Sequence, residues 1–481
     1  MTALAVDVTA ATQSGGALTP AAVTATAHSH GRLPFAFGRA FTISLLLGTL
    51  WTIPAWFVAP AWQPRYIGMM GLWDFAVLAA WLVDLNRLPK PAQLEIRRSW
   101  SAPLTLAHAA SVRVEIHNAG AGAIRAAVVD ELHNDLRREP ATFAIFVAAG
   151  VAAEHSFPVM PRKRGDIAAG RVFLRYQSAL GLAERWAVSD LRQTVRVLPD
   201  LAQAQNSALY LIRSRQVEME TRRRRQRGQG RDFESLREYR RGDEMRDICW
   251  TATARRNFLT TRVYQVERSQ AVWIVMDAGR LLRTEVSDPH CPIVREKLDY
   301  AVDAALSLAQ VASQSGDRVG LLAYGRKVRQ SIAAGRGALH LRAMLDALSL
   351  VRSESAEANH SLAVRTLLHR QSRRSLIVWL TDFAETAITP EVIDYAIHLT
   401  ARHVVVFAAI AQPDLTELAR TIPTNAGEMF RHAAALEVVQ RRQRLFRQLR
   451  ERGVMVIDIA AAGFAAALVN QYLEVKDRNL I

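Results

Sequence analysis

The sequence contains few cysteines and none of several common catalytic motifs. Only Cys249 and Cys291 occur in 481 residues, too few for a disulfide scaffold or a four-thiolate zinc site. The small number fits a reducing compartment. The phosphate loop G-x-x-x-x-G-K-[ST], the zinc motif H-E-x-x-H and the nucleophile motif G-x-S-x-G are all missing. We therefore expect a protein that is not an enzyme.

Acidic residues are also scarce relative to basic ones. The chain has 61 Lys+Arg and 45 Asp+Glu, a net charge of +16, and 50% of its residues are hydrophobic, which excludes a wholly disordered chain. From Arg213 to Arg262 the sequence holds 15 arginines, no lysine and 8 acids, a net of +7. Such a stretch can bind nucleic acid or anionic headgroups. Base-stacking aromatic residues are missing from the arginine run itself, so we expect no nucleic acid and keep it as an alternative.

The amino-terminal part predicts a tail and a membrane anchor. Residues 1–34 lack helical or strand periodicity, lack the basic start of a secretory signal peptide, and are expected to be disordered. Residues 41–59 carry no charge and residues 66–83 carry only Asp74, and each stretch is long enough to span a bilayer. We predict a two-helix transmembrane hairpin over residues 35–90. A buried hairpin of a soluble domain is the alternative, and Asp74 would face the partner helix or mark the depth of the span.

The distribution of basic residues predicts the orientation of this hairpin. Only Arg65 lies in the short loop, whereas six basic residues flank the two helices: Arg32, Arg39, Arg87, Lys90, Arg97 and Arg98. The positive-inside rule places such flanks in the cytoplasm. We therefore expect the soluble domains to face the cytoplasm, with the lipid bilayer as a partner.

The rest of the chain predicts two soluble domains joined by an arginine-rich connector. Residues 92–200 contain short runs that alternate with a period of two, as in antiparallel strands, and predict a small β-sandwich-like scaffold. Residues 201–269 form the connector. Residues 270–481 alternate apolar runs with helical patterns, which predicts a parallel, doubly wound α/β sheet covered on both faces.

Two acids follow apolar runs of this last domain. Asp277 and Asp382 each come directly after a predicted strand, where ligands bind in sheets of this kind. The arrangement resembles the von Willebrand factor type A fold, whose adhesion site holds Mg²⁺ through Asp-x-Ser-x-Ser, a Thr and a second Asp. Here Gly279 and Leu281 stand at the two hydroxyl positions, and Ser361 lies near the third. We therefore expect Asp277 and Asp382 to form a degenerate metal site with no bound cofactor, Mg²⁺ included.

The segment from Arg231 to Arg256 carries the most specific pattern. It resembles the signature of the domain of unknown function 58 (DUF58) family, Glu-Phe-x-x-Leu-Arg-x-Tyr-x-x-Gly-Asp-x-x-Arg-x-Ile-x-Trp followed by Ala-Arg. The matching positions that we take as candidates for domain or partner docking are Phe233, Leu236, Arg237, Tyr239, Gly242, Asp243, Arg246, Trp250 and Arg255. Two interpretations stay open: a buried ion-pair clasp between domains, with Trp250 as an apolar anchor, or a partner-binding surface.

The resemblance implies a setting as well as a fold. Members of this family resemble membrane-anchored von Willebrand type A-like proteins that are thought to assist MoxR-type AAA+ ATPases. It implies a non-enzymatic adaptor in the bacterial inner membrane that presents a cytoplasmic protein-binding domain to such an ATPase. The alternatives are an arginine-rich membrane protein that binds anionic ligands or nucleic acid, and a metal-dependent protein-binding module.

Overall fold

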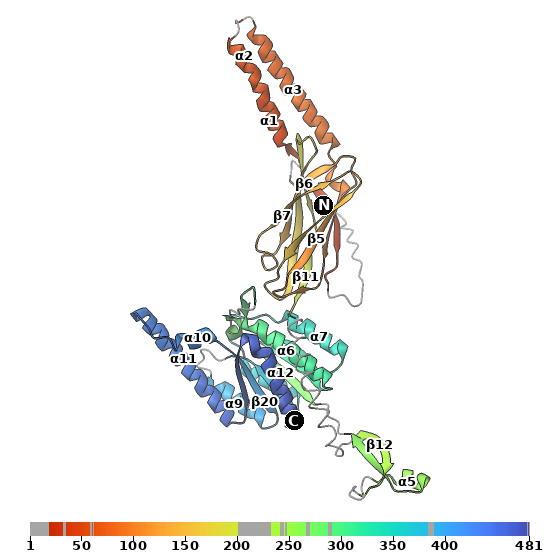
Figure 1. The fold of residues 1–481 in the computed structure, drawn as a ribbon, viewed down its shortest axis with the longest axis vertical. Helices are drawn as coiled ribbons and strands as arrows, with labels where there is room; N and C mark the ends of the chain where they lie inside the picture. Colours follow the sequence, from red (N-terminus) through yellow and green to blue (C-terminus); the bar gives the residue numbers. More distant parts are fainter. Residues whose placement is uncertain are drawn as a thin grey trace, which may run out of the picture. The chain divides into compact units, whose positions relative to one another are not determined.

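The computed structural model describes residues 19–31, 35–57, 60, 62–200, 232–240, 245, 248–265, 270–286, 291–382, 389–478 and 480. The chain forms two compact units, Met1–Leu198 and Pro199–Ile481, and each is described by itself (Figure 1). Most of the arginine-rich connector and the signature positions Gly242, Asp243 and Arg246 lie outside the described residues.

The first unit begins with a strand and continues into a helical hairpin (Figure 1). One limb consists of α1 (Arg39–Gly48), a 3₁₀ turn η1 (Thr49–Trp51) and α2 (Thr52–Phe57). The other limb is the continuous helix α3 (Gln63–Arg87). Pro54 explains the interruption, because a proline ring clashes with the carbonyl group four residues earlier, here that of Leu50. Among the described residues, α3 alone is long and apolar enough to cross a membrane.

The two limbs contact each other closely at one glycine. The indole N–H of Trp73 donates to the carbonyl of Ser44 at 2.8 Å. A Cβ atom on Gly48 would lie 2.6 Å from Cδ1 of Trp73 and 2.7 Å from Oδ1 of Asp74. Asp74 therefore faces the other limb of the hairpin. This agrees with the expectation that it faces the partner helix.

Gly48→Leu is expected to separate the limbs and to destabilise the hairpin by about 1–3 kcal/mol, since the added side chain has no space beside Trp73. Gly68→Leu on α3 is the control, because nothing lies within 4 Å of a Cβ at that position. The thermal midpoint of the full-length protein in detergent should fall for the first variant and stay unchanged for the second. Equal midpoints would contradict the close contact.

The β domain of the first unit is an eleven-stranded sheet, antiparallel except for the parallel pair β4–β11, and β1 links two groups of its strands. One contains β1 (Val23–Ser29), β3 (Leu94–Trp100), β5 (Ala110–Asn118) and β8 (Ala152–Val159). The other is built around β9 (Gly165–Gln177), which pairs with β6 (Ile124–Leu132), β10 (Ala183–Ser189) and β11 (Gln193–Leu198). Its remaining strands are β7 (Ala141–Val147), β2 (Phe35–Phe37) and β4 (Leu104–Thr105). Residues alternate between buried and exposed positions along β3 and β6, as the sequence pattern predicts.

Strand β1 corrects one expectation. Residues 23–29 were expected to belong to a disordered tail, but they pair with β3 at one end and with β10 at the other. Ala27 is 2% exposed. The composition of the segment is polar and small, so its order depends on pairing with strands far along the chain, which local periodicity does not show.

A buried ion pair lies inside the β domain. The guanidinium group of Arg98 donates to both carboxylate oxygens of Asp130 and also to the carbonyls of Gly170 and Leu191. Both side chains are fully buried. Arg98 was counted among the basic residues that flank the membrane, and the structure instead uses it inside the protein.

The hairpin is joined to the β domain by hydrogen bonds and not by a linker. Asp84, near the end of α3, accepts from the backbone N–H of Ala183 at 2.9 Å, and Arg185 donates to the carbonyl of Leu85 at 3.0 Å. The aromatic rings of Phe37 and Trp81 contact each other at the same junction, with centroids 4.8 Å apart. The helices and the β domain therefore meet in one packed joint, which also contains the 3₁₀ turn η2 (Pro91–Gln93).

The second unit contains a six-stranded sheet in the order β18-β17-β14-β19-β20-β21. Its strands are β14 (Ala271–Asp277), β17 (Arg318–Tyr324), β18 (Val328–Gly335), β19 (Leu376–Leu380), β20 (Val404–Ala411) and β21 (Met455–Ala460). All neighbours are parallel except β17 and β18. The five parallel strands confirm the predicted apolar runs, whereas the antiparallel edge strand β18 was not predicted.

Helices cover both faces of this sheet (Figure 1). One layer contains α6 (Lys297–Gln314), α7 (Ala338–Leu350) and α12 (Ala461–Asp477), and the other contains α8 (His360–Arg370), α9 (Thr389–Thr400) and α11 (Ala426–Glu451). Trp273 and Trp379 of the sheet pack with apolar residues of α8, α9 and α11 in one buried cluster. The shorter elements are η4 (Arg280–Arg283), β15 (Glu285–Val286), β16 (Arg295–Glu296) and α10 (Pro413–Leu418). The mixed α/β fold agrees with the prediction.

The second unit also contains a small hairpin module. Strands β12 (Asp232–Glu238) and β13 (Thr260–Gln265) pair antiparallel, and α5 (Trp250–Arg256) lies between them in the sequence. Cys249 donates its backbone N–H to the carbonyl of Thr260 at 2.8 Å, which ties the start of α5 to β13. Both cysteines are free thiols.

Candidate functional site

The fold brings the two predicted acids to the same edge of the sheet. Numbered in chain order, the strands run 3-2-1-4-5-6, so the order reverses between β14 and β19. Ligands of open α/β sheets bind at such a switch point. Asp277 is the last residue of β14 and Asp382 follows β19 by two residues, and they are 2% and 1% exposed. The prediction that both lie at the carboxyl ends of strands is confirmed.

Asp277 is held by donors of the protein itself. Its Oδ1 accepts from the backbone N–H of Gly279 at 2.6 Å, and its Oδ2 accepts from the hydroxyl of Thr381 at 2.7 Å. Burial raises the pKa of Asp277, and the charge of nearby Asp382 acts in the same direction. The two carboxyl groups are thus close enough to influence each other's ionisation.

Asp382 is bound by two cationic side chains. The ammonium group of Lys297 donates to its Oδ2, and the guanidinium group of Arg442 donates to its Oδ1. Lys297 and Asp382 are both fully buried, and burial lowers the pKa of Lys297. We call Asp382 with Lys297 and Arg442 the cation clasp.

Arg442 links the clasp to two further strands. It donates to the carbonyl of Ile410 in β20 at 3.2 Å and to Oδ1 of Asp458 in β21 at 2.8 Å. Burial alone would lower the pKa of Arg442, but the carboxylates of Asp382 and Asp458 outweigh it and raise the pKa. The guanidinium group therefore stays charged and connects the helix α11 to the sheet edge.

Sequence reasoning did not find Lys297 or Arg442. They lie 85 and 60 residues from Asp382 in the chain, so no local motif connects them. The available signal was a lysine at the first position of an apolar helix, where a positive charge opposes the helix dipole. Such a residue needs a nearby acid.

The donors at this edge do not fit a Mg²⁺ ion. Mg²⁺ requires an octahedron of oxygen ligands, and the described residues contain no cluster of three or more potential metal-ligating His, Cys, Asp or Glu side chains. A side chain at Gly279 would meet the backbone nitrogen of Ala358 at 2.8 Å, so a hydroxyl residue does not fit there. The hydroxyl of Ser361 donates to Asn359, the residue that caps α8.

The signature residues within the described part lie on the hairpin module. Leu236 and Arg237 belong to β12, and Tyr239 follows it and donates its backbone N–H to the carbonyl of Leu259 at 2.8 Å. Trp250 begins α5 and is 63% exposed within this unit, and both interpretations of the signature stay predictions. Arg255 is exposed on the same helix. The proposed ion pairs of Asp243 involve positions outside the described residues.

An exposed apolar surface lies where α10 leads into α11. We call this surface the α10–α11 tip and define it by its exposed apolar residues, Leu418, Ile422, Met429 and Phe430. The buried residues of α11 start only at Ala435, so the first turns of this helix extend beyond the sheet (Figure 1).

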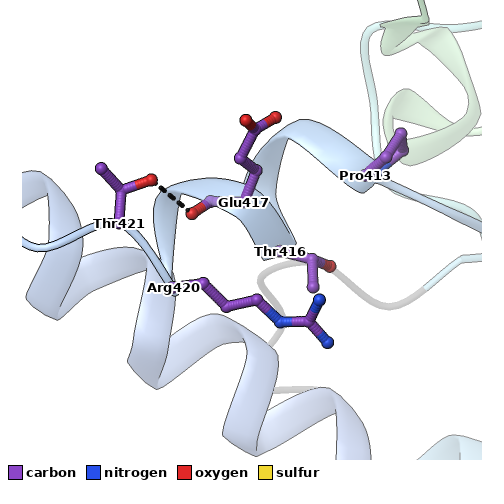
Figure 2. A pocket seen from close by; sticks show the side chains of 5 residues that line it. All are labelled: Pro413, Thr416, Glu417, Arg420 and Thr421. Atoms are coloured by element: carbon purple, nitrogen blue, oxygen red, sulfur yellow. Dashed lines mark hydrogen bonds between the residues drawn. The ribbon is translucent and has the colours of Figure 1, made fainter.

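A shallow pocket lies along α10 beside the tip (Figure 2). It is lined by Pro413, Thr416, Glu417, Arg420 and Thr421. Thr421 donates its hydroxyl to the carbonyl of Glu417 at 2.9 Å, which stabilises the end of the helix. The charged side chains of the pocket are one acid, Glu417, and one base, Arg420.

Three comparisons with known proteins bear on the identity of the chain. The family model described as "Protein of unknown function DUF58" matches residues 235–444. Uncharacterized proteins of Mycobacterium tuberculosis and Mycobacterium bovis are 28% identical over 158 residues, which is 32% of this chain and 48% of theirs. The chain thus spans about half the length of the curated relatives it matches.

Solved structures also match part of this chain, at low sequence identity. The VWA domain of SpRpn10 is 13% identical, with a TM-score of 0.27, and the match covers 42% of this chain and 95% of that domain. The conserved hypothetical protein BatB from Bacteroides thetaiotaomicron is 10% identical, with a TM-score of 0.29, over 44% of this chain and all of that one. The matched family model and the mycobacterial relatives confirm the predicted resemblance to the DUF58 family, which the family model places over residues 235–444.

Proposed function

We propose that this protein is a membrane-anchored, non-enzymatic adaptor that presents a protein-interaction module to a MoxR-type AAA+ ATPase acting on client proteins. The observation that carries the proposal is the α10–α11 tip, where four large apolar side chains are exposed on one projection of the second unit. Exposed apolar patches of this kind mark protein-interaction sites. The identity of the ATPase rests on the family resemblance.

The helical hairpin supports membrane anchoring. Only 11% of the most apolar 18-residue stretch of α3 is buried inside the protein, whereas the core helix of a soluble domain is mostly buried. Leu46 on α1 and Leu72 and Phe75 on α3 are 66–69% exposed. Lipid would cover these side chains. We propose that both limbs span the bacterial inner membrane, with Arg39, Arg87 and Lys90 on the cytoplasmic side.

The tip supports binding of a partner protein. Ile422 and Phe430 are 84% and 78% exposed, and Met429 between them is 61% exposed. Burying such side chains against a partner contributes about 1.5–3 kcal/mol for each one. Interface energy concentrates in a few large apolar or aromatic anchors, so a few substitutions at the tip test the whole proposal.

A capture experiment tests the proposal. Full-length protein in detergent should retain a purified MoxR-type ATPase encoded in the same genome, and the double variant Ile422→Ser/Phe430→Ser should reduce its apparent affinity at least tenfold. Leu339→Ser is the matched control, because Leu339 is 87% exposed on α7, which belongs to the helix layer on the opposite face of the sheet from α11. Unchanged binding by the double variant, or equal loss with the control, would exclude the tip as the docking surface.

A further inference from the structure

We propose that the ammonium group of Lys297 takes the place of a metal ion at the sheet edge. It supplies there the positive charge that a divalent metal supplies in metal-dependent adhesion sites. On this basis the module folds and binds without a divalent cation. The inference rests on the cation clasp and does not depend on which partner the protein binds.

The first support is the location of the ammonium group. Lys297 is fully buried and its Nζ donates to Asp382, the acid that corresponds to the second carboxylate of such a metal site. Isolated ammonium groups are very rarely buried, because removing the charge from water costs several kcal/mol. A lysine in this environment keeps its charge where a buried carboxylate balances it, as Asp382 does here.

The second support is the position of Lys297 in its helix. It is the first residue of α6, where the helix dipole favours anions and disfavours cations. Glu296 and Asp299 satisfy the terminal N–H groups of the helix through a reciprocal capping box. The lysine therefore does not stabilise the end of the helix. Its ion pair with Asp382 explains why a lysine occupies this position.

The third support is that the oxygens of both acids already have donors. Asp277 accepts from Gly279 and Thr381, and Asp382 accepts from Lys297 and Arg442. A divalent ion would have to displace the ammonium group and would then face the adjacent guanidinium charge. Removal of Lys297 frees Oδ2 of Asp382 and leaves space for a small ion, but Arg442 stays on Oδ1, so we expect only weak binding of a divalent ion by this variant.

Binding of Mn²⁺ tests the inference, since Mn²⁺ takes the same oxygen ligands as Mg²⁺ and is easily measured. Equilibrium dialysis and thermal unfolding are performed on the full-length protein in detergent, with MnCl₂ or with chelator. The wild type should bind no Mn²⁺ above the level of Asp382→Asn, and its thermal midpoint should be the same in both conditions. Lys297→Ala should have a lower midpoint in chelator and should regain part of the loss with saturating Mn²⁺.

Two further results test whether Lys297 replaces a metal ion. The uncharged double variant Lys297→Met/Asp382→Asn should fold without any response to Mn²⁺, which shows that the response requires the carboxylate. Saturable Mn²⁺ binding by the wild type that Asp382→Asn abolishes would overturn the proposal. If Lys297→Ala does not fold, the dialysis comparison of the wild type with Asp382→Asn still decides.

Discussion

Replacement of Asp382 by alanine is expected to lower the free energy of unfolding of the α/β unit by about 3–5 kcal/mol, since breaking a buried ion pair leaves an uncompensated charge. In this variant Lys297 stays fully buried without its carboxylate, so it either holds an uncompensated charge or gives up its proton, and both cost stability. Arg442 retains Asp458 as a partner, so the main cost arises at the lysine. The effect should therefore be comparable to that of truncating a large core side chain.

Urea unfolding followed by tryptophan fluorescence measures this effect, because Trp273 and Trp379 lie in the sheet with at most 2% exposure. Glu437→Ala is the control, since Glu437 forms an exposed pair with Arg441 on α11. The control should leave the transition almost unchanged. A transition of the Asp382→Ala variant within 1 kcal/mol of the wild type would mean that the lysine is solvated or otherwise paired.

Replacement of Arg98 by methionine is expected to destabilise the β domain by a similar amount, about 3–5 kcal/mol. Asp130 would stay buried without its bidentate partner, and the carbonyls of Gly170 and Leu191 would lose their donors. The double variant Arg98→Met/Asp130→Leu should recover most of the loss, since two apolar side chains of similar volume can replace a buried ion pair.

Limited proteolysis and thermal unfolding of the full-length protein measure this second effect. Arg113→Met provides the control, because Arg113 and Glu154 form a pair in which both side chains are more than half exposed. If Arg98→Met and Arg113→Met were equally stable, the buried pair would have no special energetic role. If the double variant were as unstable as the single one, packing and not charge would explain the loss.

Features with a local period could be predicted from the sequence. The apolar runs of β14, β17, β19, β20 and β21 identified the parallel strands, and the position of Asp277 and Asp382 after two of them placed both acids at one edge. The strand period and the turn positions are encoded within a few neighbouring residues. The fold class and the location of the candidate site therefore followed from the sequence.

Features that depend on distant pairing could not be predicted in this way. Strand β1 obtains its order from β3 and β10, and the acid at the sheet edge obtains its cations from Lys297 and Arg442. Glycine at position 279 indicated the loss of a metal ligand, but it did not indicate what replaces the metal. The cations that contact Asp382 come from α6 and α11, which are distant in the sequence and meet only in the folded protein.

The packed joint between α3 and the β domain has a consequence for the membrane-anchored arrangement that we propose. A flexible tether would let the domain sample many heights and orientations above the lipid. Here Asp84 and Arg185 fix the domain to the end of the helix, so its height and tilt follow those of the anchor. With the hairpin in a bilayer as proposed, a second membrane-bound protein would meet the β domain in one orientation, which lowers the entropic cost of a complex assembled at the bilayer surface.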